Sequence, residues 1–185
     1  MRRRVVAAGD RDWSDRALLD SGLPGHASAL APVIGHGMSE DRGHGAPVAG
    51  PHGFSVEWLR IPPGNAVGRH RLAEKQVVIV FSGAMDITLN AAGAAVAVRV
   101  EAGEVFSVPG GAWRVLAAAG EGPVEATLVT AGDQRKRIVW APEVAEAALA
   151  AGTGLDHDGH VAALSFLPPP TRAAVIAQMM GEAAE

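Results

Sequence analysis

The chain has 185 residues, which suits one domain with terminal extensions, and it carries a formal net charge of -4 at pH 7 and no cysteine. The lack of cysteine excludes disulfides, thiolate metal sites and cysteine nucleophiles, so any metal must be held by His, Asp, Glu or amide oxygen. Because charges of both signs are scattered along the sequence, no basic face is available for a phosphate backbone, and we expect no nucleic-acid partner.

The N-terminal sequence and the overall hydropathy pattern bear on location. No stretch approaches the roughly 20 apolar residues that a membrane-spanning helix requires. Asp10 interrupts the apolar run that follows the arginines at positions 2–4, so a secretory leader is not expected. We therefore expect no membrane partner and a cytoplasmic protein, which the absence of cysteine fits. The abundance of Ala, Gly and Arg is typical of a high-GC bacterial genome.

The first 53 residues are predicted to form an arm that packs on the rest of the chain. Residues 12–20 have the composition of a short helix, with Asp12 or Ser14 as its N-cap. Beyond them, Gly, Pro and His predominate up to position 53, so we expect irregular structure with one strand near 29–34.

From residue 54 to 141 the sequence changes to short β-type runs separated by turn residues, which is typical of a sandwich or barrel. In the first run Phe54, Val56 and Trp58 alternate with polar residues and share one face, which predicts antiparallel sheet. The expected strands are 54–61, 76–81, 85–90, 95–100, 104–108, 113–117, 124–130 and 136–140.

Residues 142–185 are predicted to form a C-terminal helical extension. The first helix, 142–151, has Pro142 at its first position and a glycine stop, and the second, 171–184, follows three prolines.

Between these helices, Asp156-His157-Asp158-Gly159-His160 superficially suggests a metal loop. An EF-hand needs Glu at the twelfth position, where Leu167 stands, so we interpret the segment as a loop connecting the helices.

Two stretches of the sequence begin with a glycine and carry polar residues, glycine or proline at regular intervals after it. In the first, Gly64 is followed after five residues by His70, and six residues separate Gln76 from Gly83. In the second, Gly103 is followed after five residues by Pro109-Gly110-Gly111 and, two residues later, by Arg114. The glycines and the proline suit hairpin corners and tight turns.

These stretches, within positions 54–131, resemble the paired motifs of the cupin superfamily. The first family motif is Gly, five residues, His-x-His, three or four residues, Glu, six residues, Gly, and the second is Gly, five residues, Pro-x-Gly, two residues, His. The resemblance implies an all-β fold: the cupin double-stranded β-helix, an RmlC-like jelly-roll barrel, with short N-terminal and C-terminal helical extensions.

The resemblance also places the usual metal ligands, which bind Fe, Mn, Ni or Zn in metal-bearing cupins, at His70, Leu72, Gln76 and Arg114. Leucine cannot ligate, an amide oxygen is a poor ligand for a transition metal, and arginine repels a cation. We therefore predict no metal cofactor. A divalent transition metal anchored on His70 stays open as the alternative, because geometry decides such sites.

The same positions suit a small, anionic organic substrate. Arg114 would hold a carboxylate, enolate or phenolate, Gln76 would orient it, and His70 would move a proton. The pocket is predicted to be lined by Trp58, Leu72, Val78, Val80 and Phe106. Resemblance to epimerase-type and cyclase-type cupins implies metal-independent acid-base chemistry, such as isomerisation, cyclisation or elimination in bacterial secondary metabolism.

Several alternatives stay open. Arg114 could point outward and pair with Glu125 or Glu121, and His70 could be purely structural. One of the histidines His36, His44 and His52 could fold back and rebuild a site with His70.

Competing functions are a metal-dependent cupin oxygenase with an altered ligand set and a non-catalytic ligand-binding cupin. The resemblance further implies a homodimer.

Overall fold

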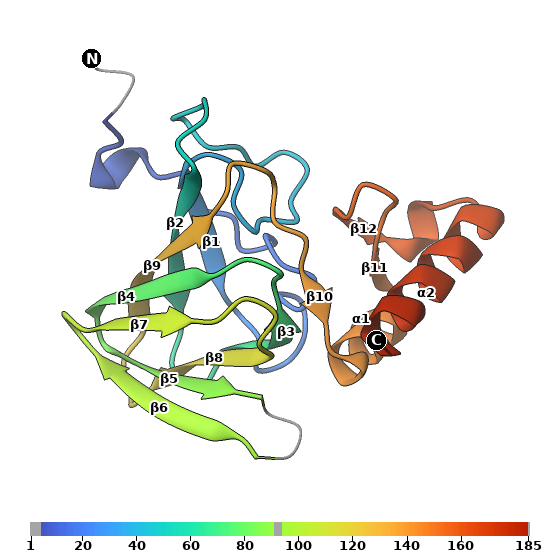
Figure 1. Ribbon diagram of the computed structural model, residues 1–185. Helices are drawn as coiled ribbons and strands as arrows, with labels where there is room; N and C mark the ends of the chain where they lie inside the picture. The colour runs from blue at the N-terminus through green and yellow to red at the C-terminus, as the bar shows by residue number, and fades with distance from the viewer. Residues whose placement is uncertain (1–4, 91–93, 185) are drawn as a thin grey trace.

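The structure is a computed structural model that describes residues 5–90 and 94–184, so the expectation for the arginines at positions 2–4 lies outside it. Two five-stranded antiparallel sheets face each other as a barrel, and the C-terminal extension packs at one side (Figure 1). The first sheet has the order β1 (Ala29–Ile34), β2 (Phe54–Ile61), β9 (Val124–Ala131), β4 (Gln76–Ser82), β7 (Val105–Val108). The second has the order β10 (Val139–Trp140), β3 (Ala66–Arg71), β8 (Arg114–Ala119), β5 (Ala84–Leu89), β6 (Val96–Glu101).

The core lies between the inner faces of the two sheets. In β4, Gln76, Val78 and Val80 are buried while the intervening residues are partly exposed, which is the period of two expected for a strand with one face inward. Burying a Val or Leu side chain contributes about 1.5–3 kcal/mol each, so this shared interior is the main source of stability. The predicted all-β jelly-roll fold is confirmed.

The predicted hairpin corners are confirmed at two motif glycines. Gly83, between β4 and β5, has φ +72°, and Gly103, between β6 and β7, has φ +89°. A Cβ at Gly83 would also lie 2.5 Å from the carbonyl oxygen of Pro123. Both the backbone conformation and the close approach therefore require glycine at position 83.

The N-terminal arm contributes a strand to the barrel, as predicted for 29–34, because β1 pairs with β2. The predicted helix at 12–20 is wrong. That segment consists of turns, and Ser14 forms a bridge to Leu30 through two backbone hydrogen bonds of 2.9 and 3.0 Å. Four consecutive residues, 17–20, are buried, whereas a helix would turn some of them toward solvent. The described helix of the arm is the short 3-10 turn η2 (Ala8–Asp10).

The sequence did not predict β3, which carries His70, because its run of Gly, Arg and His lacks alternating apolar residues. The domain boundaries at residues 53 and 141 stay a prediction.

The C-terminal extension contains α1 (Pro142–Ala150), β11 (Thr153–Leu155), β12 (Val161–Ala163), η3 (Leu164–Phe166) and α2 (Pro169–Ala184). Both predicted helices are confirmed. The segment between them is not a simple connecting loop, because β11 and β12 pair as an antiparallel hairpin. Within the described ranges, no helix combines the length and apolar character needed to cross a membrane.

Candidate functional site inside the barrel

His70, Gln76 and Arg114 meet inside the barrel, and each is 0% exposed. His70 on β3 and Arg114 on β8 are directly paired residues of the second sheet. Gln76 lies on β4 of the opposite sheet, and its Oε1 accepts a hydrogen bond of 3.2 Å from Nη1 of Arg114. The three predicted residues are thus brought together across the barrel. The alternative of an outward Arg114 is wrong, and Glu125 instead pairs with Arg60.

The imidazole of His70 has one engaged and one unpartnered nitrogen. Nδ1 lies 2.8 Å from the carbonyl oxygen of Gly68, and since a carbonyl can only accept, we assign the proton to Nδ1. Nε2 is buried and has no hydrogen-bond partner in the described part of the chain. Burial, with a smaller contribution from the charge of Arg114, lowers the pKa of His70 to about 3. His70 is therefore neutral near pH 7, with the lone pair of Nε2 facing the interior.

The guanidinium of Arg114 is a buried cation that no described ion pair neutralises. Its Nε donates to the carbonyl oxygen of Ala112 at 3.3 Å, and its Nη2 is buried without a partner among the described residues. Burial lowers the pKa of Arg114 to about 10, against the attraction of the Glu74 carboxylate. The group keeps its charge at neutral pH, and both N–H donors of Nη2 remain free.

Gln76 is fixed in orientation by its two neighbours. Its Nε2 donates to Oγ1 of Thr130 at 3.0 Å, which leaves Oε1 directed at Arg114. Ser55 lies across β9, paired with Thr130, and its buried hydroxyl has no partner within the described ranges. This layer of the barrel is therefore polar on both sheets.

Of the five residues predicted to line the pocket, four pack in the barrel interior, and their contact with a substrate stays a prediction. Leu72, Val78 and Val80 are fully buried, and Phe106 packs partly buried against the core. Trp58 does not line the interior; it lies on the outer face of the first sheet.

Trp58 stacks on Phe81 at a centroid distance of 4.6 Å, and the guanidinium of Arg11 lies 3.7 Å from its ring. Alternation along β2 correctly placed Trp58 on the same face as Val56, but it did not determine which face of the strand points into the barrel. The buried set of β2 contains Glu57 instead.

Glu57 is a buried residue that sequence reasoning missed. Both of its carboxylate oxygens accept a hydrogen bond from the backbone N–H of Met38. Burial raises the pKa of Glu57 to about 7, opposed by the Met38 N–H and by the charge of Lys136. The sequence contained one signal for this burial: Glu57 lies between the apolar residues Val56 and Trp58 on β2, and its side chain points to the opposite face of the strand from theirs.

The donor set at the four cupin ligand positions does not fit a metal ion. His70 offers the single good ligand of the set, since Leu72 is apolar, and Oε1 of Gln76 is a poor ligand for a transition metal and accepts from Arg114. The guanidinium would lie beside any cation and repel it. The chemistry of these side chains disfavours a metal ion, and the absence of a metal cofactor stays a prediction.

The N-terminal histidines do not rebuild the site. His44 contacts Ser39 at 3.2 Å and the carbonyl oxygen of Asp12 at 2.6 Å, and the His52 ring packs near Phe54. Among the described contacts, none joins these histidines or His36 to His70. The aromatic neighbour of His70 is instead Trp140, with ring centroids 5.5 Å apart.

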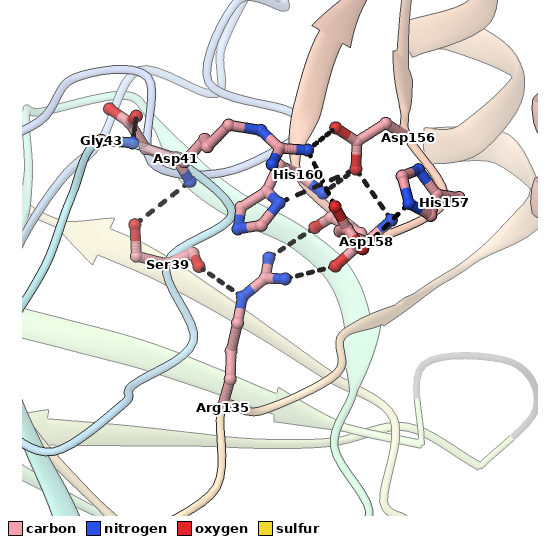
Figure 2. Close-up of polar contacts among 10 residues, drawn as sticks. Ser39, Asp41, Gly43, Arg135, Asp156, His157, Asp158 and His160 are labelled. Carbon is pink, nitrogen blue, oxygen red and sulfur yellow. Dashed lines mark hydrogen bonds and ion pairs between the residues drawn. The ribbon is translucent and has the colours of Figure 1, made fainter.

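The acidic segment of the extension joins it to the N-terminal arm (Figure 2). Oδ2 atoms of Asp156 and Asp158 accept hydrogen bonds from Nη2 of Arg42 at 2.6 and 3.1 Å. Ligand atoms of Asp156, His157 and Asp158 lie within 4.8 Å of one another, yet an arginine already occupies the carboxylates. Arg135 reaches the same loop by donating to the carbonyl oxygens of Asp158 and Gly159 (Figure 2). The cluster therefore has a structural explanation.

Comparisons with known proteins agree with this geometry. Residues 57–130 match the family model described as Cupin domain. A solved oxalate oxidase superimposes with a TM-score of 0.52 and 15% identity, covering 86% of this chain and 75% of that one. An oxalate decarboxylase from Lactobacillus farciminis, in complex with formate, gives 0.50 and 17%, covering 69% of this chain.

This chain spans 32% of the length of that decarboxylase. A vicilin from tomato is similar over 48% of this chain and 26% of its own length, with a TM-score of 0.44 and 13% identity. A comparison with curated protein sequences gave no match. At these identities the structural likeness concerns the fold alone. The family match, the two spaced motifs and the jelly-roll barrel together show that residues 57–130 of this chain form a cupin domain.

Proposed function

We propose that the barrel binds a small organic acid between Arg114 and His70 and promotes metal-independent acid-base chemistry on it. One observation carries the proposal: two directly paired residues present a buried free donor, Nη2 of Arg114, and a buried free acceptor, Nε2 of His70. Buried polar atoms in proteins are nearly always hydrogen-bonded, so this pair calls for a ligand with one acceptor and one donor. A protonated carboxylic acid has both, and a carboxylate meets the same two groups when its adjacent acidic C–H lies against Nε2 of His70.

The two residues would have distinct roles in such chemistry. Arg114 holds the anionic oxygen and stabilises the negative charge of an enolate. Nε2 of His70 removes a proton from carbon and returns it at another position, which completes an isomerisation without any change in redox state. An anion on Arg114 offsets the charge that helps depress the pKa of His70, and so makes the imidazole a stronger base.

Binding without turnover is the second candidate. The pKa of His70, about 3 in the free barrel, makes the imidazole a weak base, which favours a protein that binds an acid and does no chemistry. The two candidates differ in whether protons bound to carbon exchange with solvent.

The proposal is tested with a panel of acetate, pyruvate, benzoate and oxalate. Calorimetry is expected to find a binding acid, and Arg114→Ala should weaken that binding at least tenfold, since a hydrogen bond to a charged group contributes about 1.5–3 kcal/mol. The matched control is Arg99→Ala, which removes an exposed arginine paired with Asp86 and should leave affinity unchanged. Equal affinity in Arg114→Ala and the parent protein would contradict the proposal.

Chemistry is measured by proton NMR in heavy water on the acetate and pyruvate complexes, because these two acids carry protons on the carbon next to a carbonyl group. Loss of that proton signal that requires His70 supports acid-base catalysis. Tight binding of either acid with no such exchange supports the binding protein.

We also propose that the chain forms a homodimer, as the resemblance implies. The outer face of the first sheet supports this, because Phe81, which stacks on Trp58, is 54% exposed and Val105 on the neighbouring strand β7 is 62% exposed. Light scattering during gel filtration should give the mass of a dimer for the parent and that of a monomer for Phe81→Lys. A monomeric parent protein would overturn the proposal.

A further inference from the structure

We infer that residues 35–40 form a gate, whose Met38 side chain plugs the barrel and must withdraw before an acid can reach Arg114 and His70. This inference rests on the proposed function, and it adds how access to the same site is controlled. It depends on where Met38 lies, on what holds it there, and on the space into which the segment can move.

Met38 fills space directly beside the site. Its side chain comes from irregular chain between β1 and β2, yet the residue is only 1% exposed. Its sulfur lies 3.7 Å from Nε2 of Gln76, whose Oε1 binds Arg114. A ligand resting on Gln76 and Arg114 therefore competes with the methionine for the same volume. Methionine suits a movable plug because its unbranched chain adapts to irregular space.

The plug is held by a carboxylate that otherwise has no role in the site. The Met38 N–H donates to both oxygens of Glu57, at 2.9 Å for Oε2. A Cβ at Gly37 would lie 1.6 Å from Oε1 of Glu57, so only glycine lets the carboxylate lie against this segment. Lys136 is the charged group whose field acts on Glu57, and its Nζ donates to the carbonyl oxygen of Gly132.

The segment is anchored at its C-terminal end and has room beside the rest. Glu40 is 2% exposed, and its carboxylate accepts hydrogen bonds from the backbone N–H of Leu19 and from Nε1 of Trp140, so this residue is the fixed end of the gate. Ahead of it, opening must break the hydrogen bond from Nε of Arg135 to the carbonyl oxygen of Ser39.

The segment lies at the end of the barrel where β9 leads into β10 (Figure 1), and the carbonyl oxygen of Gly37 accepts from the backbone of Lys136 there. Two cavities, of about 490 and 300 Å³, are both lined by Gly35 and His36. Outward movement of residues 35–39 therefore meets open space, while Glu40 and the barrel strands need not move.

In the closed state, three polar atoms of the site have no contact with solvent. Nη2 of Arg114, Nε2 of His70 and Oγ of Ser55 are all buried without partners among the described residues. With Met38 seated, each of these residues is 0% exposed, so a ligand has no direct route to them. Opening of the gate supplies that route.

The first test needs no ligand. Native-state hydrogen exchange should show the Met38 amide exchanging by local opening, at least tenfold faster than amides of β4 such as Val78. Exchange of Met38 only through global unfolding, at the rate of Val78, would overturn the gate.

The second test locks the gate reversibly. The chain has no cysteine, and the Cβ position at Gly37 lies 2.2 Å from Cδ of Glu57, which is two bonds from its own Cβ. Paired substitutions Gly37→Cys and Glu57→Cys are therefore within disulfide reach. Binding of the panel acids is measured on the same double variant, reduced and oxidised, so the reduced form is the matched control.

The results separate the two proposals. Binding by the reduced form that falls at least tenfold on oxidation supports the gate. Equal binding by both forms overturns the gate and leaves the proposed function standing. If no acid binds to the parent protein, the proposed function fails, and the exchange rate at Met38 alone decides whether the segment opens.

A substitution at Met38 gives an independent check. Met38→Ala should raise affinity for the panel acids about tenfold by vacating the volume beside Gln76. Met38→Leu, which keeps nearly the same volume, is the control and should bind as the parent does. Lower affinity in a folded Met38→Ala protein would contradict the inference.

Discussion

Replacing Arg114 with methionine is expected to stabilise the fold while abolishing acid binding. The pKa of Arg114 falls from its usual value to about 10, so the folded state carries its charge at neutral pH at a cost of about 3 kcal/mol. Methionine fills a similar volume and removes that cost, but leaves Oε1 of Gln76 without its donor. We expect a net gain in the free energy of unfolding of about 1–3 kcal/mol, as when hydrophobic residues replace other buried charges.

Urea denaturation of the parent and the Arg114→Met protein at pH 7 measures this difference directly. Arg99→Met is the control, since Arg99 lies 57% exposed in a surface pair, and it should change stability by less than about 1 kcal/mol. Destabilisation by Arg114→Met would show that the guanidinium is structural. Stabilisation together with lost binding would identify a residue retained for function at the expense of stability.

The scaffold could be predicted from the sequence because its signals are local. Gly83 and Gly103 mark corners where φ is positive, and the spacing of the two motifs places His70, Gln76 and Arg114 around one interior. The prediction of a short helix at 12–20 was wrong because a contact with a distant segment decides the structure there. Backbone pairing of Ser14 with Leu30 outweighs local helix propensity.

The missing parts of the site are set by contacts between distant segments. Met38 enters the barrel from irregular chain, and its position depends on Glu57 and Gln76, neither of which is near it in the sequence. Alternation along β2 defined two sets of residues, but hydrophobicity favoured Trp58 for the interior over Glu57. A carboxylate is tolerated there because a backbone N–H meets it, which no spacing rule reveals.

Acid is expected to destabilise the protein specifically through His70. The imidazole has a pKa of about 3 when folded and its usual 6.5 when unfolded, so below pH 6.5 only the unfolded chain takes up this proton. The stability that neutral His70 provides is complete above pH 6.5 and is lost as pH falls toward 3. Between pH 6.5 and 4.5 the loss amounts to roughly 2–3 kcal/mol.

Two buried carboxyls act in the opposite direction and hide this effect in the parent protein. Burial raises the pKa of Glu57 to about 7 and that of Glu40 to about 8, so each is protonated more readily when folded, and its contribution to stability falls as pH rises from about 4.5. The contribution of His70 therefore appears in a comparison with His70→Asn, whose side-chain amide can still donate to the carbonyl oxygen of Gly68 but does not titrate.

Urea titrations at pH 6.5 and 4.5 should show the parent losing roughly 2–3 kcal/mol relative to His70→Asn. His157→Asn, at a side chain 83% exposed, is the control and should show no such difference. If the parent and His70→Asn instead respond equally to pH, then the pKa of His70 is the same in the folded and unfolded protein. Below pH 6.5 the imidazolium would then be a second cation beside Arg114, and Nε2 would be a donor to a bound carboxylate. His70 could act as the base only above that pH, so this titration also decides the pH range in which the proposed chemistry can begin.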